Sequence, residues 1–293
     1  MRVSTKSSFW IGLFVMCLGL LSGCQSAITS SNATGSSGVV NVVAAENFYG
    51  DIARQVGGSH ASVTSILSDP NTDPHEFTAN TKTLQEIIGA KLVIKNGLDY
   101  DNWMDQLLSN ASNPHQIVLT AGAIALHKLP DNPHVWYSFD NVQAVAQSIA
   151  HSLEQLDAPD KATFEANLAT FDASLNSLRQ KTNEIKQTYG GTPVALTETI
   201  YLYQTELTGL NVLTPFEFMK AIAEGNDPPA NTVLDIQNEV AHKQVKIVIY
   251  NEQTVTPITS NVQSEAQAQH IPLVPVWETM PPGKTYQNWM MGQ

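Results

Sequence analysis

The stretch Asp73-Pro74-His75-Glu76-Phe77 returns in similar form later in the chain as Asn132-Pro133-His134-Val135-Trp136. Each copy has an Asx residue, a proline, a histidine and, two positions after the histidine, an aromatic residue. Proline fixes its own φ and keeps the preceding residue out of the helical region, so each histidine is presented from a stiff corner. Two imidazoles presented in this way indicate a metal site. The alternative is a pair of Asx-Pro turns with solvated histidines.

Strand and helix signals alternate around both corners. Short apolar runs predict strands at residues 39–45, 62–67, 92–94 and 116–119. Helical spacing of apolar residues predicts helices at residues 48–56, 78–90 and 100–108. The first corner follows the second strand, and the other corner follows a loop after the fourth. Such alternation with buried strands predicts a mostly parallel sheet covered by helices.

A long stretch without strand signals separates this half from a second one. Two helical stripes cover residues 140–188, broken at Asp157-Ala158-Pro159. After Gly190-Gly191 the pattern resumes, with strands at 193–196, 211–213, 245–250 and 273–276 and helices at 199–208, 232–243 and 257–269. We therefore expect an α/β protein with two lobes, residues 39–158 and 190–293, joined by a rigid backbone helix over residues 159–189.

Composition restricts the class of protein. The 293 residues are 42% hydrophobic, which is enough for a sizeable core and excludes a disordered chain. Only 14% of the residues are charged and the net charge is −12. Nucleic acid is therefore not an expected partner, because binding it requires clustered Lys and Arg.

The N-terminus has the features of an export signal. Arg2 and Lys6 precede an apolar run at residues 9–21, which is too short for a membrane span. Leu21-Ser22-Gly23-Cys24 follows and resembles a bacterial lipobox. We expect a lipoprotein signal peptide over residues 1–23, a lipid on Cys24 and a flexible tether over 24–38, rich in Gly, Ser, Thr and Asn. This predicts a protein anchored at the outer face of the cell membrane; the alternative is an ordinary cleaved signal peptide.

Ligands of open α/β sheets bind beyond the carboxyl ends of the strands. In the second half, Glu198 follows the strand at 193–196, and Glu278 follows the strand at 273–276. Glu252 also follows a strand and competes with Glu278 for the same role. Two imidazoles and two carboxylates can thus converge between two lobes.

With these residues the chain resembles the zinc- and manganese-binding receptor lipoproteins of bacterial ABC importers, the TroA-like superfamily, from about residue 40 to the end. The two Pro-His corners resemble the first two ligand motifs of that family. Glu198 falls at the third ligand position, which is His in typical zinc receptors and Glu in typical manganese receptors. The resemblance implies two α/β lobes on a helical backbone and the metal ligands His75, His134, Glu198 and Glu278.

The chain departs from the family pattern in three respects. Glu278 stands where the family usually has Asp, the His-rich loop of many zinc receptors is missing, and the chain ends at Gln293, early for the family's last helix.

The resemblance implies a receptor that captures one Mn²⁺ or Zn²⁺ and delivers it to a membrane permease, and we expect a monomer. Glu198 and the missing His-rich loop favour manganese slightly, although a site of nitrogen and oxygen ligands generally binds zinc more tightly. Trp136, Tyr201 and Trp277 are candidates for an apolar layer around the ligands, with ordinary core packing as the alternative. The remaining histidines are expected to be structural or solvated.

Two other functions are open to this sequence. A lipid-anchored surface adhesin is compatible with it. A metallohydrolase is less favoured, because the His-Glu-x-x-His pattern that begins at His75 fails at Ala79, and the chain has no Gly-x-Ser-x-Gly motif. Four protein ligands also leave no open coordination position for a reacting water, so we do not expect an enzyme.

Overall fold

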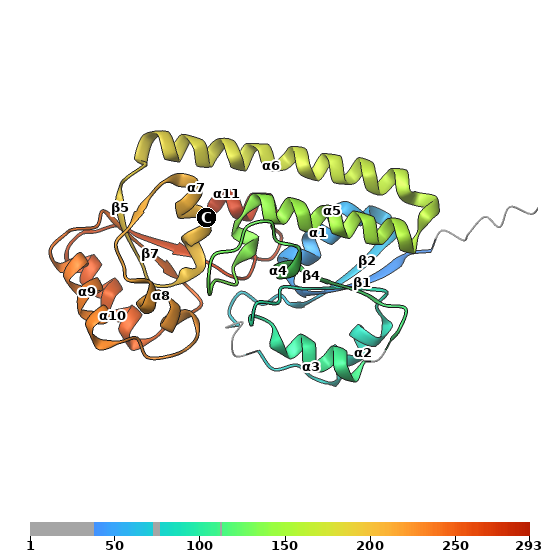
Figure 1. Cartoon of the computed structure of the whole chain (residues 1–293), viewed down its shortest axis with the longest axis horizontal. Coiled ribbons are helices and arrows are strands. Elements are labelled where there is room, and N and C mark those ends of the chain that lie inside the picture. The colour runs from blue at the N-terminus through green and yellow to red at the C-terminus, as the bar shows by residue number, and fades with distance from the viewer. Residues whose placement is uncertain (1–37, 73–76, 112) are drawn as a thin grey trace, which may run out of the picture. The chain divides into compact units, whose positions relative to one another are not determined.

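A computed structural model of the chain describes residues 38–72, 77–111 and 113–293. It contains two four-stranded sheets in which every pair of neighbouring strands is parallel (Figure 1). The first sheet has the order β2-β1-β3-β4 and the second the order β6-β5-β7-β8. The predicted fold class, α/β with parallel sheets and a long helix, is confirmed. The predicted signal peptide, Cys24 and Asp73 to Glu76 of the first corner lie outside the described residues, as does the tether apart from Gly38.

The first sheet is buried on both faces. Its strands are β1 (Val40–Glu46), β2 (Ala61–Leu67), β3 (Leu92–Lys95) and β4 (Ile117–Thr120). Side chains alternate along β1: Val42 and Ala44 belong to one apolar cluster, and Val43 and Ala45 to another. The first cluster includes residues of α1 (Asn47–Gly57) and α5 (Phe139–Leu156), and the second includes residues of α2 (Thr81–Gly89) and α3 (Asn102–Asn110). Helices thus cover each face, as the uninterrupted apolar strands predict.

Helix α2 begins three residues later than the apolar spacing predicts. The side chain of Asn80 accepts hydrogen bonds from the backbone N–H groups of Lys82 and Thr83, at 3.0 and 3.2 Å. Asparagine in this position satisfies N–H groups that have no partner inside the helix. The cap therefore sets the start of the helix at Thr81.

The predicted backbone helix is α6 (Lys161–Tyr189), which has 29 residues. Its buried side chains include Phe164, Phe171, Leu175 and Leu178. It contacts α1 and α5 from the first half of the chain and α7 (Leu202–Thr208) and α11 (Tyr286–Gly292) from the second. It ends at Gly190, where a Cβ would lie 2.6 Å from the Lys186 carbonyl oxygen, so a residue without a side chain is required there.

The second sheet repeats the strand order of the first. Its strands are β5 (Pro193–Leu196), β6 (Asn211–Val212), β7 (Ile247–Asn251) and β8 (Leu273–Val276). The other helices of this half are α8 (Phe216–Ala223), α9 (Ala230–Ala241) and α10 (Pro257–Ala268). In each sheet the second strand in the chain lies on one side of the first, and the third lies on its other side. The strand order therefore reverses between β1 and β3 and between β5 and β7. These are the positions at which open α/β sheets bind ligands.

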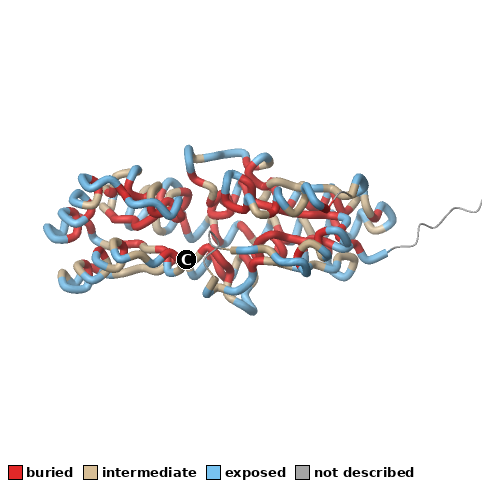
Figure 2. Tube along the Cα trace, turned by 90° about the horizontal axis from the view of Figure 1, so that it is seen from below, coloured by how far each residue is buried: buried red, intermediate tan, exposed pale blue. Residues whose placement is uncertain are grey.

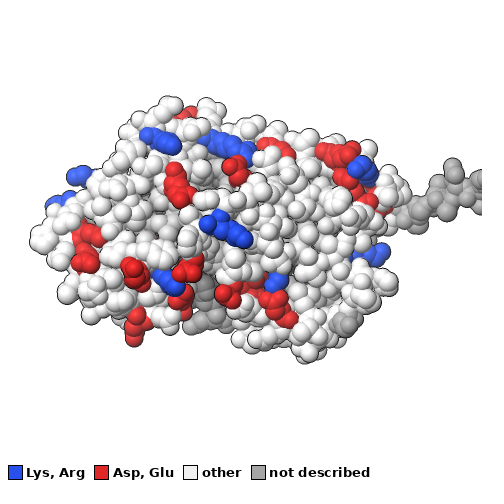
Figure 3. Space-filling view, viewed as in Figure 1, with Lys and Arg blue, Asp and Glu red and all other residues white. Residues whose placement is uncertain are grey.

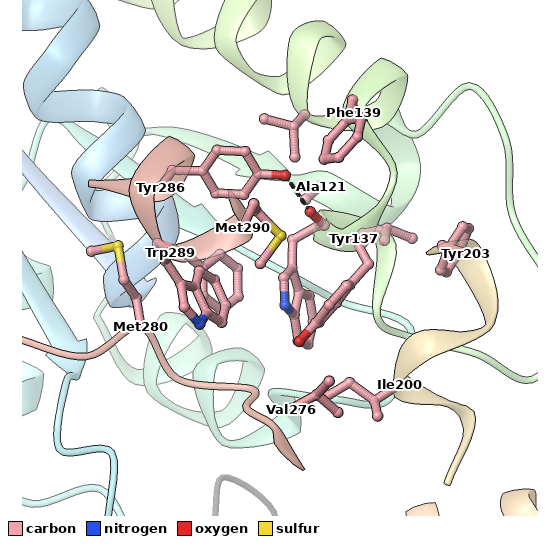
Figure 4. Packing of buried hydrophobic residues seen from close by; sticks show 14 of the residues in the cluster. Ala121, Tyr137, Phe139, Ile200, Tyr203, Val276, Met280, Tyr286, Trp289 and Met290 are labelled. Atoms are coloured by element: carbon pink, nitrogen blue, oxygen red, sulfur yellow. Dashed lines mark hydrogen bonds between the residues drawn. The ribbon is translucent and has the colours of Figure 1, made fainter. Parts of the chain in front are cut away.

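The sequence analysis did not predict α8 or α11. Both helices are short, so packing rather than helix propensity stabilises them. Helix α11 inserts Tyr286, Trp289 and Met290 among aromatic residues of the first half (Figure 4). The Tyr286 hydroxyl donates to the Trp136 carbonyl oxygen at 2.6 Å, and the Trp289 ring lies 6.2 Å from that of Tyr137. Among the described residues, none of the helices is both long and apolar enough to span a bilayer.

Buried residues follow the strands and the inner sides of the helices, and the outer turns are exposed (Figure 2). On the face shown in Figure 3, acidic and basic side chains are spread among uncharged ones, and the described residues form no extended basic area there.

Candidate metal centre

Three buried side chains with metal-ligating atoms meet beyond the carboxyl ends of the strands. His134 precedes the 3-10 helix η3 (Val135–Tyr137), Glu198 follows β5 by two residues, and Glu278 follows β8 by two. Each is at most 1% exposed. One ligand atom from each of the three lies within 4.8 Å of the others. His75, the fourth predicted ligand, lies outside the described residues.

Asn132 sets the orientation of His134. Its Oδ1 accepts from the His134 backbone N–H at 3.0 Å and lies 2.8 Å from His134 Nδ1. Because the amide oxygen is an acceptor, Nδ1 carries the proton and Nε2 keeps its lone pair. His134 Nε2 lies 3.4 Å from Glu198 Oε1, and within the described part of the chain neither atom has a hydrogen-bond partner. Buried polar atoms are nearly always paired, so these two atoms fit a bound cation.

The loop that carries His134 is held from both halves of the chain. Asn132 Nδ2 donates to the Thr199 carbonyl oxygen at 2.8 Å, next to Glu198. Asn96 Nδ2 donates to the Pro133 carbonyl oxygen at 2.9 Å. The stiff corner predicted from the proline is thus also fixed by side-chain hydrogen bonds on each side.

Neutral donors orient the two carboxylates. Asn251, the last residue of β7, donates from Nδ2 to Glu198 Oε2 at 2.6 Å and to Glu278 Oε1 at 2.5 Å. Tyr100 donates its hydroxyl hydrogen to Glu278 Oε2 at 2.7 Å. Burial, and then the charge of Glu278, raises the pKa of Tyr100 well above its usual value, so the phenol stays a donor. Asn251 and Tyr100 are neutral donors, so they do not cancel the charge of the two carboxylates, and a divalent cation would neutralise it.

The backbone of Glu278 is fixed by a second amide side chain. Gln253 Oε1 accepts from the backbone N–H groups of Glu278 and Thr279, at 2.7 and 2.9 Å. Glu252, which competes with Glu278 in the sequence analysis, is exposed. The inward position at this strand end belongs instead to Asn251.

The three predicted aromatic residues occupy different positions. The ring of Trp136 lies 5.1 Å from that of His134 and stacks on Phe48 at 4.6 Å. Tyr201 packs against Tyr137 at 5.9 Å and donates to the Gln293 carbonyl oxygen. Trp277 accepts the Tyr137 hydroxyl hydrogen at its carbonyl oxygen. The aromatic side chain in contact with His134 from this set is therefore Trp136.

A hollow of about 440 Å³ opens beside the centre, and its lining includes Tyr100, Asn132 and Pro133. The acidic residues Asp99, Asp131 and Glu224 also line it. Lys220 pairs with Asp131 at 2.7 Å and with Glu224 at 3.7 Å. Clustered acidic side chains at an opening raise the local concentration of cations.

Four features of the centre escaped the sequence analysis, namely the roles of Asn96, Tyr100, Asn251 and Gln253. Asn251 carried a usable signal, since it directly follows the predicted strand at 245–250 and stands next to Glu252. The other three occupy loops, where sequence gives no indication of the direction of a side chain.

Comparisons with known proteins identify the family of the chain. The model of the family described as zinc-uptake complex component A, periplasmic, matches residues 42–293. The metal ABC transporter substrate-binding lipoprotein ScbA of Streptococcus cristatus is 29% identical over 192 residues, covering 61% of each chain. The manganese ABC transporter substrate-binding lipoprotein ScaA of Streptococcus gordonii is 27% identical over the same length and coverage. The chain thus aligns with about 61% of the length of these relatives.

A solved structure has the same fold. The periplasmic zinc-binding protein TroA of Treponema pallidum superimposes with a TM-score of 0.74 at 15% sequence identity. The superposition covers 87% of this chain and 96% of TroA. The two-sheet arrangement is therefore a known architecture.

Proposed function

The chain belongs to the family of zinc-uptake complex component A, and from this premise we propose that it is the metal-binding receptor of an ABC importer. The family consists of solute-binding proteins that are not enzymes, in agreement with the absence of catalytic motifs from the sequence. We propose that His134, Glu198 and Glu278 hold one divalent transition-metal ion as cargo, and that His75 is the fourth ligand.

The pair His134 Nε2 and Glu198 Oε1 is the observation that carries the proposal. The two atoms are buried, face each other at 3.4 Å and have no hydrogen-bond partner among the described residues. An arrangement meant only for stability would pair them, because an unsatisfied buried polar group costs about 1–3 kcal/mol. A metal ion between them removes that cost.

The ligands come from both halves of the chain, which supports capture between two lobes. His134 belongs to the half before α6, and Glu198 and Glu278 to the half after it. We propose residues 39–158 and 190–293 as the lobes and 159–189 as the connecting helix. Binding then joins the two lobes, and a membrane permease recognises that state.

We propose manganese as the cargo and zinc as its main competitor. Two carboxylates can supply up to four oxygens, which suits the higher coordination number of manganese. ScaA is named for manganese and TroA for zinc, so both ions occur among similar proteins. General affinity trends favour zinc at almost any such site, so availability as well as affinity would select the ion.

The membrane location follows from Cys24. A lipid on its thiol would hold the receptor at the outer face of the membrane, next to the permease. The named lipoproteins among the relatives support this assignment.

Metal binding by the purified protein tests the proposal. Native mass spectrometry and competition calorimetry with manganese, zinc and ferrous iron would give stoichiometry and affinity for each. We expect tight cargo binding in the wild type and its loss in His134→Ala. His127→Ala is the matched control, because His127 is exposed and its imidazole pairs with Glu206 at 2.9 Å, outside the proposed ligand set. Unchanged affinity in His134→Ala would overturn the ligand assignment.

A further inference from the structure

A second group of metal-ligating side chains lies at the amino ends of the strands of the first sheet, away from the carboxyl ends. We propose that His60, Asp157 and Asp160 form a second divalent-cation site. It is separate from the metal centre at His134, Glu198 and Glu278, which is called the cargo centre below. This inference does not depend on the proposed function.

The three residues come together at the amino ends of the strands. His60 ends the 3-10 helix η1 (Gly58–His60), directly before β2 starts at Ala61. Asp157 follows the last residue of α5, and Asp160 immediately precedes the first residue of α6. The cargo centre lies beyond the carboxyl ends of the strands, so the two sites are on different edges of the fold.

The distances suit coordination of one ion. His60 Nδ1 lies 2.9 Å from Asp160 Oδ2 and 4.0 Å from Asp157 Oδ2, and one ligand atom from each residue lies within 4.8 Å of the others. Ligand atoms around a tetrahedral zinc ion lie roughly 3.4 Å apart, given metal–ligand distances of about 2.1 Å. Small side-chain rotations would therefore bring all three onto one ion.

The carboxylate of Asp157 points to a missing ligand. Its side chain is 3% exposed, and its Oδ2 has no hydrogen-bond donor within the described part of the chain. A buried carboxylate oxygen without a donor is costly, and His60 reaches it only at ion-pair distance.

Among the described residues, the lysine next to Asp160 in the chain is paired with other carboxylates. Lys161, the first residue of α6, pairs with Glu154 and Glu165. The cluster itself sets one imidazole beside two carboxylates. A divalent ion bound between them would balance the charge of the two carboxylates.

His60 is oriented for this role without being sealed from solvent. Its ring packs edge-on against buried Phe164, with 5.9 Å between centroids. The side chains of His60 and Asp160 are 26% and 21% exposed. Water can complete the coordination of an ion bound here, so we expect weaker binding than at the fully buried cargo centre. One nitrogen and two carboxylates suit zinc or a similar borderline ion.

Zinc stoichiometry of the full-length protein tests this site. With zinc alone as the probe, native mass spectrometry should show two ions on the wild type and one on Asp157→Asn. The Asp157→Asn change should lower the zinc affinity of the second site by at least about tenfold. Loss of a residue that only supports a ligand already lowers metal affinity by about 10- to 100-fold. Glu154→Gln is the matched control, because it removes a carboxylate beside the cluster that bonds to Lys161. This control should keep both ions.

His60→Gln provides a second variant at a partly exposed position, and circular dichroism shows whether each variant is folded. His134→Ala should lose only the cargo ion, and His134→Ala combined with Asp157→Asn should lose both. One zinc ion on the wild type, or two on folded Asp157→Asn and His60→Gln, would overturn the second site. Failure of the cargo proposal has a different result, in which His134→Ala keeps its full complement of zinc.

Discussion

Asn132 determines which nitrogen of His134 faces the ligand position. The amide oxygen lies 2.8 Å from Nδ1, while the amide nitrogen donates to the Thr199 carbonyl oxygen. A single side chain thus fixes the imidazole tautomer and links it to the residue after Glu198. In the motif Asn-Pro-His, the proline stiffens the corner and the asparagine aims the ring.

Asn132→Leu should therefore weaken metal binding by about 10- to 100-fold, the usual effect of losing the partner of a ligating histidine. The change keeps the approximate size of the side chain but removes the acceptor at 2.8 Å from Nδ1, which leaves only the Thr199 hydroxyl at 3.5 Å. Competition calorimetry measures the affinity. Leu153→Ala is the control for stability, because it empties a buried position on α5 away from the ligands. It should lower stability by about 2–5 kcal/mol and leave the affinity unchanged. Equal affinity in Asn132→Leu and wild type would contradict the role of Asn132.

The sequence predicts the candidate ligands that the structure brings together better than it predicts the residues that support them. His134, Glu198 and Glu278 stand next to strand ends and rigid motifs, and chain position alone brings such residues to one edge of a sheet. Asn251 differs, since it is an amide that donates to two carboxylates 53 and 27 positions away. No local pattern specifies a donor that serves partners so distant in the chain. The preference for Asn251 over Glu252 is a matter of which side chain points inward at the end of β7.

Helix α9 carries a buried acid whose ionisation opposes folding. Glu239 is 5% exposed and accepts from the Thr214 hydroxyl at 3.1 Å. Burial raises the pKa of Glu239 to about 7. The folded protein therefore favours the neutral acid. This contribution to stability is complete below the usual carboxyl pKa and is lost as the pH rises through about 7.

Glu239→Gln should remove this pH dependence. The free energy of unfolding of the variant minus that of the wild type should increase by about 1–3 kcal/mol when the pH is raised from 4.5 to 8. Urea unfolding at the two pH values measures the difference. Glu217→Gln, at an exposed position of α8, is the control, and its free energy of unfolding relative to wild type should change little with pH. A constant difference between Glu239→Gln and wild type across this range would show that Glu239 ionises normally in the folded state.

Helix α11 shows the limit of prediction at the level of elements. Strands and long helices have enough periodic residues to be recognised, and their ends differ from the structure by a few residues. Helix α11 has seven residues and follows a loop, so tertiary contacts decide whether it forms. Its aromatic side chains complete a core that belongs mainly to the other half of the chain.

Trp289→Ala should lower the free energy of unfolding by about 3–5 kcal/mol, because the indole is 3% exposed and leaves a large cavity. Met291→Ala lies two positions later on the same helix, at a residue that is 44% exposed. It should change stability by less than about 0.5 kcal/mol. Thermal and urea unfolding of both variants provide the comparison. Equal effects would mean that α11 is not packed as described.

At the scale of the whole molecule, the proposed metal centre requires that both halves are folded. His134 is placed by loops of the first half, the two glutamates follow strands of the second, and α6 and α11 pack on both. A ligand that binds only the folded state stabilises it by mass action, by about 2.7 kcal/mol at 100 times the dissociation constant.

Hydrogen exchange can locate that stabilisation, with β3 as reporter of the first half and β7 of the second. We expect manganese or zinc at this concentration to slow exchange of the slowest amides in both strands by about 100-fold, since they exchange only on global unfolding. His134→Ala should remove the effect from both strands at once. Protection gained by β7 alone would mean that the glutamates bind metal without the first half, and the site would then not join the two lobes.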